Sequence, residues 1–350
     1  MMRLPAFRYR APRTIEDAVA WLAEDPDTTM ILAGGTDLLP NMKRRQQVPA
    51  TVVGLRAVRG KLSAIRNGDG LTVGAGVTLS NVIAVPRVRE SYPGLWQAAA
   101  QVATPHLRNM GTIGGNLCLD TRCTYYDQNY EWRKSIDFCM KKDGSTCWVA
   151  TSSPKCLAVS STDTAPMLQA LGATVTLVST RGRRVLPVSD LYANDGIHYL
   201  TKQPDEILTS IALPPSNGWR SAYWKLRRRG AFDFPVAAAA VAARLDGTRV
   251  IEARIVLGAV ASRPLEAGRA EALLADENLT DELIATAAAA ASEVAKPMDN
   301  TDFELVWRKK MVRSLVAHAL HEIRGDDVRA RRRQLARQEL LSIQPVDPHP

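Results

Sequence analysis

The sequence predicts a mixed α+β protein in two domains, and three observations lead to this expectation. The chain has 350 residues, enough for two or three domains at about 150 residues each. Through its first 215 residues, short segments with strand and helix periodicity follow one another in irregular order. From about 216–222 the pattern changes to two long strands followed by alanine-rich helices. A content of 46% hydrophobic and 23% charged residues is ordinary for a globular protein and excludes a disordered or fibrous one.

The first domain is expected to begin with an amphipathic helix. Thr14 is a suitable N-cap residue, Asp17 follows three positions later, and apolar residues recur at helical spacing between Ile15 and Leu22. Further on, β-branched segments punctuated by glycine predict strands, and Gly182 is placed to turn a hairpin. The expected strands cover 29–32, 51–55, 71–77, 173–179, 184–188 and 206–213, and helices are expected from Ser80 and over 96–103.

The second domain is expected to contain two paired strands and a set of helices. The strands cover 235–245 and 250–260, and the helices cover 264–274, 280–296 and 303–323. Residues after about 326 have the character of an exposed tail, because prolines interrupt a polar segment. The longest apolar run is far shorter than the roughly 20 residues of a membrane span, and the N-terminus lacks the pattern of an export signal. We therefore expect a cytoplasmic protein.

Positive charge is concentrated in two places. The net charge is +9, the stretch Trp219–Gly230 holds five basic residues and no acid, and Arg331–Arg333 lie in the expected tail. Three interpretations are open: a solvated surface, a site for an anionic cofactor, substrate or subunit, and a nucleic-acid surface. No nucleic-acid-binding motif accompanies the charge, which argues against the third.

Two glycine-rich turns are candidate phosphate sites. The first is 33–37 (AGGTD), directly after a predicted strand, and the second is 111–116 (GTIGGN). Paired glycines let backbone N–H groups converge on phosphate oxygens, because no Cβ blocks the approach. Neither turn fits the dinucleotide-binding GxGxxG or the P-loop pattern, so each of them could equally be a plain tight turn.

Four motifs occur along the chain in a fixed order: AGGTDLLP at 33–40, TPHLRNMGTIGGNL at 104–117, SSTDTAP at 160–166 and KLRRRGAFD at 225–233. This ordered set resembles the FAD-binding subunit of the molybdenum hydroxylases, over roughly residues 3–325. That family includes xanthine dehydrogenase, carbon monoxide dehydrogenase and the aromatic-CoA reductases. The resemblance implies a two-part FAD-binding domain of the PCMH or vanillyl-alcohol-oxidase type over 1–218, with parts at about 1–55 and 56–218. It also implies a smaller α/β domain over 219–325, of the CO dehydrogenase flavoprotein type, followed by a tail over 326–350.

The resemblance also assigns roles to individual residues. It places the FAD pyrophosphate against the two glycine-rich turns, a hydrogen bond to the cofactor at Asp163, and Leu208 and Lys225 beside the isoalloxazine ring. A cation there stabilises the anionic N1–C2=O region of reduced flavin. Asp163 could instead be a helix N-cap, Leu208 a core residue and Lys225 a surface base. The expected cofactor contacts are Ala33, Gly34, Gly35, Thr36, Asp37, Leu38, Thr112, Gly114, Gly115, Asn116, Asp163, Leu208 and Lys225.

All five cysteines lie between Cys118 and Cys156, a clustering that random placement gives about once in a thousand sequences. Disulfides are not expected in a large chain without an export signal, so metal or redox chemistry is indicated. Four thiolates can hold a tetrahedral Zn²⁺ or a [4Fe–4S] cluster. The sequence has neither the CxxC pairs of structural zinc sites nor the spacing of ferredoxins, so the motif alone decides neither case.

The candidate ligands Cys123, Cys139, Cys147 and Cys156 are separated by 15, 7 and 8 residues, inside an insertion of about 118–157. Six of the 20 aromatic residues lie in this segment, which favours a small packed cap with a low-dielectric interior. Its position between two stretches assigned to FAD favours electron transfer over structural zinc. The spacing resembles the β subunit of 4-hydroxybenzoyl-CoA reductase, a branch with an inserted [4Fe–4S] segment. Cys118 is then expected to be a buried thiol, although an exchange of roles with Cys123 stays open.

The resemblance therefore implies an FAD and [4Fe–4S] electron-transfer subunit of a molybdenum enzyme. Its expected partners are a molybdenum-cofactor subunit, a subunit with two [2Fe–2S] clusters, and reduced ferredoxin as donor, which the basic stretch around Arg227–Arg229 could dock. The implied reaction is reductive dehydroxylation of 4-hydroxybenzoyl-CoA to benzoyl-CoA. One alternative is a subunit of an aldehyde or N-heterocycle oxidoreductase of the same superfamily. Another is a flavin-free scaffold held by zinc.

Overall fold

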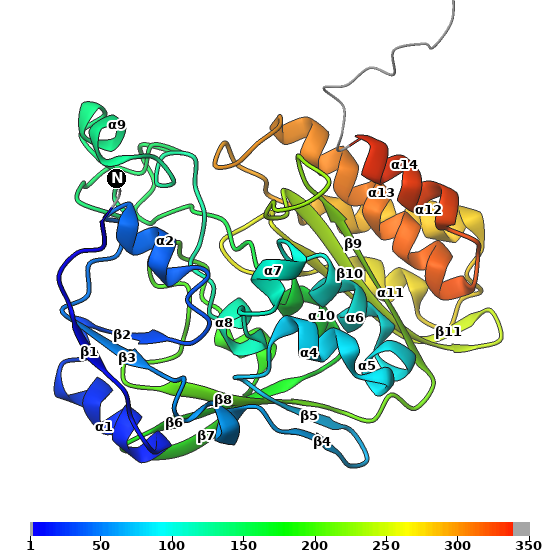
Figure 1. Ribbon diagram of the computed structural model, residues 1–350. Helices are drawn as coiled ribbons and strands as arrows, with labels where there is room; N and C mark the ends of the chain where they lie inside the picture. The colour runs from blue at the N-terminus through cyan, green and yellow to red at the C-terminus, as the bar shows by residue number, and fades with distance from the viewer. Residues whose placement is uncertain (1–2, 339–350) are drawn as a thin grey trace, which may run out of the picture.

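The computed structural model describes residues 3–338 and contains three β-sheets with helices between and around them (Figure 1). This confirms the expected mixed fold, in which two parts of a larger domain are followed by a C-terminal domain. None of its helices within the described residues is both long enough and apolar enough to cross a membrane.

The first part of the chain forms a small parallel sheet. Its strands are β1 (Arg8–Arg10), β3 (Thr51–Gly54) and β2 (Thr29–Leu32), in that order across the sheet. Helix α1 (Ile15–Glu24) begins as predicted, because the Thr14 hydroxyl accepts a bond from the Asp17 N–H while the Asp17 carboxylate accepts one from the Thr14 N–H. Helix α2 (Leu38–Lys43) follows the first glycine-rich turn directly.

The second part is built on a five-stranded antiparallel sheet. The strand order is β4 (Ile65–Asn67), β5 (Leu71–Gly74), β8 (Ile207–Leu213), β6 (Thr174–Ser179) and β7 (Gly182–Pro187). The predicted hairpin is formed by β6 and β7, and Gly182 is the first residue of β7, directly after the turn, with a positive φ of 119° that a glycine adopts without strain. The helices of this part are α3 (Arg59–Leu62), α4 (Leu79–Ala84), α5 (Pro86–Ser91), α6 (Pro93–Ala100), α7 (Pro105–Arg108), α8 (Ile113–Leu117), α10 (Thr164–Ala170) and the 3₁₀ turn η1 (Val188–Leu191).

The C-terminal domain is a four-stranded antiparallel sheet covered by helices. The strand order is β12 (Leu265–Glu266), β11 (Arg249–Gly258), β10 (Ala237–Asp246) and β9 (Trp219–Leu226). Alternate alanines of β10 face opposite sides: Ala238 and Ala240 join the core of the FAD-type domain, whereas Ala237 and Ala239 join the core under the C-terminal helices. The sheet therefore belongs to both cores. The covering helices are α11 (Gly268–Leu274), α12 (Asp281–Glu293), α13 (Leu305–Arg324) and α14 (Arg329–Gln338).

Several sequence-based expectations are corrected by the structure. The helix expected over 264–274 begins only at Gly268, because Leu265 and Glu266 pair with β11 as an edge strand. The helix expected over 96–103 begins earlier, at Pro93, a residue well suited to the first turn of a helix. The expected tail contains helix α14, and both Val328 and Leu335 are buried in the C-terminal core. The rest of that expected tail, 339–350, lies outside the described residues.

The cysteine-rich insertion consists mostly of turns, with one short helix, α9 (Tyr130–Ser135). It lies above α2, at the upper left of Figure 1. The expected apolar shell is only partly present: Tyr126 is buried, but the side chains of Tyr130, Trp132 and Trp148 are between about a third and a half exposed. The aromatic content therefore does not by itself produce a closed cap.

Hydrogen bonds fasten the insertion to the rest of the chain on two sides. The Gln46 side chain donates to the Tyr126 carbonyl at 2.6 Å. On the other side, the Asn300 side chain donates to the Leu157 carbonyl at 2.6 Å, and the Thr124 N–H donates to the Asn300 carbonyl. The insertion is thus attached both to the first part of the chain and to the C-terminal domain.

Candidate functional site

A cavity of about 1130 Å³ lies where the parts of the FAD-type domain meet. It is larger than the range of about 300–1,000 Å³ that is usual for drug-sized ligands. Both glycine-rich turns line it, as do Asp163, Leu208 and residues of the Phe232–Phe234 loop. The space therefore suits one large, extended ligand with both polar and apolar parts.

The two glycine-rich turns contact each other. A Cβ added to Gly34 would lie 2.1 Å from the Met110 carbonyl oxygen and 3.0 Å from the Gly111 Cα. A Cβ on Gly111 would in turn lie 3.3 Å from the Thr36 hydroxyl. Glycine at position 34 is therefore required for the close approach of two backbone segments, which together form one continuous wall of the cavity.

Most of the predicted cofactor contacts lie on this wall. The expected residues that line the cavity are Ala33, Gly34, Gly35, Thr36, Asp37, Leu38, Thr112, Gly114, Gly115, Asn116, Asp163 and Leu208. Leu208 lines the cavity and is also buried in the adjoining core, so the two interpretations of this residue, as a cofactor contact and as a core residue, are compatible.

Two polar side chains of the wall, those of Asp37 and Asn116, make bonds within the protein. Asp37 forms an ion pair with Arg122 and accepts a bond from Asn41. The Asn116 carbonyl oxygen accepts bonds from both Thr162 and Thr164, and so ties the second turn to the TDTAP stretch. These side chains position the two turns that line the cavity.

Lys225 occupies a different place from the one expected. It does not line the cavity, and it is fully buried on β9 with its ammonium 2.9 Å from the Asp163 carboxylate. The Tyr223 hydroxyl donates to the same carboxylate at 2.8 Å. Burial, together with this carboxylate, raises the pKa of Tyr223 well above its ordinary value. The ion pair therefore links Lys225 to Asp163, which lines the cavity.

Asp163 stands at the N-cap position of α10, as the alternative interpretation expected. Asp163 precedes α10 but makes no capping hydrogen bond. Its carboxylate is instead held by Tyr223 and Lys225, two side chains of β9 that share one face of the strand.

The sequence analysis missed several residues of the cavity wall. Tyr199 and Lys202 line it from the segment that follows η1, and Phe232 and Phe234 line it from the loop after β9. The Lys202 ammonium donates to the carbonyls of Gln203 and Glu206, and burial lowers its pKa. No local pattern marks these residues, because they come from irregular segments whose path depends on the whole fold.

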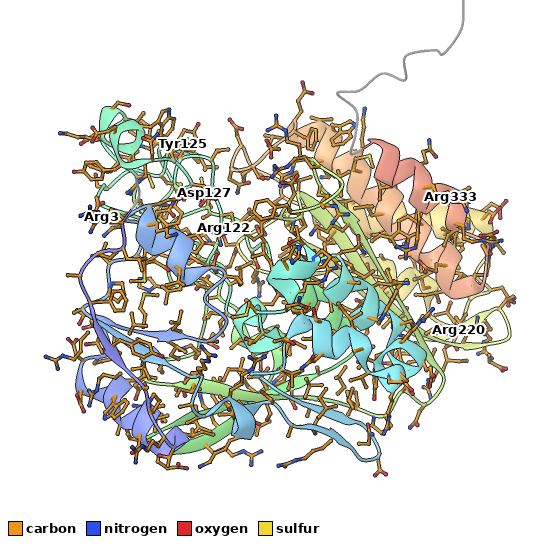
Figure 2. All side chains as sticks on the ribbon, in the orientation of Figure 1. Arg3, Arg122, Tyr125, Asp127, Arg220 and Arg333 are labelled. Atoms are coloured by element: carbon orange, nitrogen blue, oxygen red, sulfur yellow. The ribbon has the colours of Figure 1, made fainter. Side chains whose placement is uncertain are left out.

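The basic residues do not form one surface. Figure 2 shows Arg122 and Asp127 together near α2, whereas Arg220 and Arg333 lie over the C-terminal domain. Within the stretch Arg227–Arg229, Arg228 pairs with Asp302 at 3.1 Å and Arg229 pairs with Asp233. Much of the positive charge that singled out this stretch is therefore balanced by neighbouring acids.

The four candidate ligands Cys123, Cys139, Cys147 and Cys156 are free, buried thiols, and each is 5–6% exposed. Three of them share one small apolar cluster with Tyr126 and Ala158, and Cys156 interacts electrostatically with Cys147 as well. Among the described residues, no group of three or more His, Cys, Asp or Glu side chains is close enough to hold a single metal ion. The arrangement thus gathers four thiols without the tight geometry of a zinc site.

Two opposing effects act on the ionisation of these thiols: burial favours the neutral thiol, and backbone N–H groups favour the thiolate. Burial raises the pKa of Cys123 to about 12 and that of Cys156 to about 11, and the neighbouring cysteines contribute to both shifts. Backbone N–H groups counter this: those of Tyr125 and Tyr126 favour the thiolate of Cys123, and that of Ala158 donates to the Cys156 Sγ at 3.5 Å. N–H donors to sulfur are a usual feature of iron–sulfur ligands.

Cys118 is separate from this group. It lines the large cavity, and burial raises its pKa. Cys123 packs with the other ligand candidates instead. The geometry therefore favours Cys123 over Cys118 as the fourth thiol of the group.

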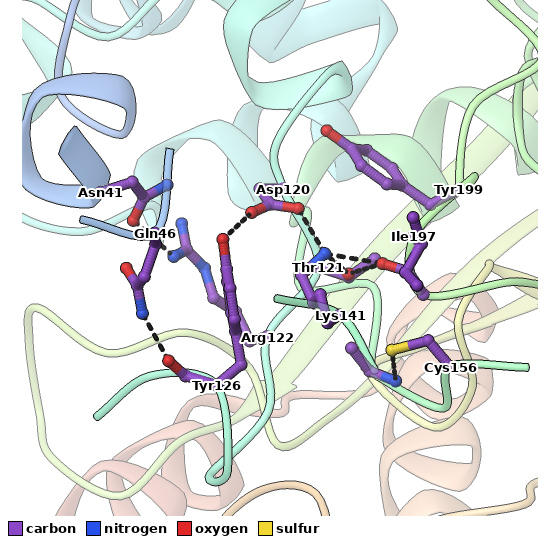
Figure 3. A network of polar contacts seen from close by, with 12 residues as sticks. Asn41, Gln46, Asp120, Thr121, Arg122, Tyr126, Lys141, Cys156, Ile197 and Tyr199 are labelled. Carbon is purple, nitrogen blue, oxygen red and sulfur yellow. Dashed lines mark hydrogen bonds and ion pairs between the residues drawn. The ribbon is translucent and has the colours of Figure 1, made fainter. Parts of the chain in front are cut away.

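A buried polar network lies between the cysteines and the cavity (Figure 3). The Lys141 ammonium donates to the Asp120 carboxylate at 2.8 Å, to the Thr121 hydroxyl at 2.8 Å and to the Gly196 carbonyl at 2.7 Å. Asp120 also accepts a bond from the Tyr126 hydroxyl at 3.2 Å, and it lines the cavity. The two candidate sites are therefore joined by fully paired polar groups.

Comparisons with known proteins agree with this geometry. Residues 5–216 match the family described as FAD binding domain in molybdopterin dehydrogenase, and residues 221–323 match the CO dehydrogenase flavoprotein C-terminal domain. The chain is 28% identical to the nicotine 6-hydroxylase medium subunit of Paenarthrobacter nicotinovorans, over 92% of this chain and 98% of that subunit. It is 30% identical to the aldehyde oxidoreductase FAD-binding subunit of Escherichia coli, over 90% and 99% respectively.

A solved structure is similar over nearly the whole chain. A chain of the carbon monoxide dehydrogenase of Hydrogenophaga pseudoflava, in a form that lacks the Mo-pyranopterin moiety, superposes with a TM-score of 0.75 at 28% identity. The match covers 91% of this chain and 98% of that one. The comparisons support FAD; they give no support for an iron–sulfur cluster in this subunit.

Proposed function

Since the chain belongs to the FAD-binding subunits of the molybdenum hydroxylase family, we propose that it is the subunit that carries both FAD and a [4Fe–4S] cluster. We propose further that its complex is a 4-hydroxybenzoyl-CoA reductase. It is an oxidoreductase subunit by family. The observation that carries the proposal is the pairing of one large cavity, walled by two glycine turns, with four buried thiols beside it.

The residues of the cavity fit FAD. The first turn lines the cavity at Gly34 and Gly35 without a Cβ in the way of its backbone N–H groups, which suits the pyrophosphate. In the second turn the Gly115 N–H is held by the Thr112 hydroxyl, so that turn contributes mainly its close packing against the first. Asp163, held by Lys225 and Tyr223, offers a fixed carboxylate to the cofactor, and Leu208 offers an apolar surface to the ring. Bound flavin exchanges electrons one or two at a time, which suits a subunit between one-electron and two-electron centres.

The four thiols fit a [4Fe–4S] cluster better than zinc. They are buried in an apolar cluster, and backbone N–H groups near Cys123 and Cys156 are placed to stabilise sulfur charge. A zinc ion needs four ligands around one point, and the described residues contain no such group. We therefore assign Cys123, Cys139, Cys147 and Cys156 to the cluster.

The proposed reaction uses partner subunits for the chemistry on the substrate. Electrons from reduced ferredoxin enter through this subunit and leave through a subunit with two [2Fe–2S] clusters. A molybdenum subunit would then use two of these electrons and two protons to reduce 4-hydroxybenzoyl-CoA, so that the phenolic hydroxyl leaves as water and benzoyl-CoA is formed. Free thiols and a low-potential donor suit a reducing compartment, and we place the complex in the cytoplasm.

A second candidate is an aldehyde or N-heterocycle oxidoreductase. It is favoured by the similarity to the nicotine 6-hydroxylase and aldehyde oxidoreductase subunits. In that case electrons leave molybdenum through the flavin to an acceptor. The purified complex decides: it is assayed with 4-hydroxybenzoyl-CoA and a low-potential donor, and separately with an aldehyde or N-heterocycle and an acceptor. Turnover only in the second assay would refute the reductase proposal.

The cluster assignment is tested on the purified protein by iron, acid-labile sulfide, zinc and FAD analysis. We expect about four iron atoms and four sulfides with one FAD. Cys123→Ser is expected to lower iron content while FAD is retained, and Cys118→Ser, the matched control from the same segment, is expected to keep its iron. Zinc in place of iron, or equal iron loss in both variants, would overturn the assignment. Zinc without FAD would support a scaffold.

A further inference from the structure

Lys141 lies in the middle of the cysteine-rich insertion, between Cys139 and Cys147 in sequence, yet its side chain is only 6% exposed. Its neighbour Lys142 is about a third exposed and pairs with Asp143. Burying an ammonium group is costly unless it is paired and hydrogen-bonded. Lys141 meets that condition through Asp120, Thr121 and Gly196.

On one side, this network reaches the cysteines through Gly196. The Gly196 N–H donates to the Cys156 carbonyl at 2.9 Å, while the Gly196 carbonyl accepts the bond from Lys141. A Cβ added to Gly196 would lie 2.6 Å from the Cys156 Sγ. Gly196 therefore lies next to both Lys141 and the Cys156 sulfur. Because residue 196 is a glycine, no side chain at that position separates the two groups.

On the other side, the same network reaches the large cavity. Asp120 lines the cavity, and so does Ile197, which directly follows Gly196. The rings of Tyr126 and Tyr199 lie 4.9 Å and 5.5 Å from the Lys141 ammonium, and Tyr199 also lines the cavity. Lys141 is thus a buried cation linked to Cys156 through Gly196 and to the cavity wall through Asp120; Figure 3 shows Lys141, Asp120 and Cys156 together.

Building on the function proposed above, we propose that Lys141 is a positioning residue that sets the reduction potential of the centre held by the four cysteines. Reduction of such a cluster adds one negative charge, and a fixed cation beside it favours the reduced form. Asp120 balances that cation. Removal of Lys141 therefore makes the local charge one unit more negative, and removal of the Asp120 charge makes it one unit more positive.

The test is a potentiometric titration of the purified protein, with the reduced cluster followed by EPR. Lys141→Met removes the charge and keeps the length of the side chain. We expect at least a tenfold shift toward the oxidised cluster at fixed potential, which is about 59 mV for a one-electron couple. Lys141→Arg is expected to restore the wild-type ratio to within about threefold, and the matched control Lys142→Met is expected to leave it unchanged.

Asp120→Asn provides the second variant, because it keeps the lysine and is expected to shift the ratio in the opposite direction. If Lys141→Met loses its cluster, the shift in the reduction potential of Asp120→Asn alone tests the role of Lys141. An unchanged potential in a variant that retains its iron would overturn the inference and leave the proposed function standing. Absence of iron from the wild-type protein would instead overturn the proposed function, and the inference with it.

Discussion

The contact between the two glycine-rich turns gives a sharp test of the cavity, through the substitution Gly34→Ala. The added Cβ would lie 2.1 Å from the Met110 carbonyl oxygen and 2.8 Å from its carbon. Real Cβ atoms do not approach within 3.0 Å, so the backbone at Met110 must retreat by about 0.9 Å. The obstructing atoms are backbone, so no side-chain rotation can relieve the overlap.

Overpacking of this kind costs about 1–3 kcal/mol, and the displacement falls directly on the wall assigned to the pyrophosphate. If that cost falls on the bound state, the dissociation constant for FAD rises by roughly 5- to 150-fold, at 1.4 kcal/mol for each tenfold. The measurement is FAD binding to the deflavinated protein, followed by flavin fluorescence, with a thermal melt of the apoprotein alongside.

Gly60→Ala is the matched control, because a Cβ at that position meets nothing within 4 Å. It lies in helix α3, where alanine is the better helix former, so we expect unchanged FAD affinity and equal or higher stability. An unchanged dissociation constant in Gly34→Ala, with an unchanged melting temperature, would refute the argument that the two turns form one wall.

Three further predictions concern buried charges. Asp163→Asn leaves Lys225 buried without its carboxylate and is expected to lower the free energy of unfolding by about 3–5 kcal/mol. Urea unfolding of this variant, of Lys225→Met and of the double variant measures the coupling between the two side chains. Additive effects on the free energy of unfolding would contradict the pairing. Arg308→Met leaves the carbonyls of Val236, Ala259 and Met298 without the Arg308 donor. It is expected to lower the free energy of unfolding by about 3 kcal/mol or more. The control Lys309→Met, at an exposed neighbouring position, is expected to change the free energy of unfolding by no more than about 0.5 kcal/mol. Burial, with the charges of Arg331, His321 and Arg332, lowers the pKa of His318 from 6.5 to about 4. The stability that depends on neutral His318 is therefore complete above pH 6.5 and is lost as the pH falls toward 4. His318→Phe is expected to flatten the pH dependence of the melting temperature between pH 4 and 6.5, and an unchanged slope would contradict this prediction.

The sequence predicted the fold well where local chemistry decides. The capping box at Thr14 and the hairpin glycine at Gly182 are short-range signals, and both are present in the structure as predicted. The hydrophobic pattern also located two of the four strands of the C-terminal sheet, β10 and β11, to within a few residues, and it missed β9 and β12. It could not anticipate α14, because that helix is mostly arginine and polar residues and is anchored by few apolar side chains.

The sequence predicted the loops of the candidate site better than it predicted the positions and partners of its charged side chains. The glycine turns carry their own backbone signature, and both line the cavity. Lys225 shows where the pattern fails: β9 is buried on both faces, so the sequence does not tell which core the lysine enters or which acid meets it there. Lys141 was equally hidden, because its burial depends on Asp120 and Gly196, which are distant in sequence.

The alternating alanines of β10 have a consequence for how the chain folds. One face of the strand completes the core of the FAD-type domain, and the other completes the core under the helices α11–α14. A break between residues 216 and 221, where the two family matches meet, would expose apolar surface on both fragments. We therefore expect the two matched regions to unfold together, because the shared strand completes the apolar core of each.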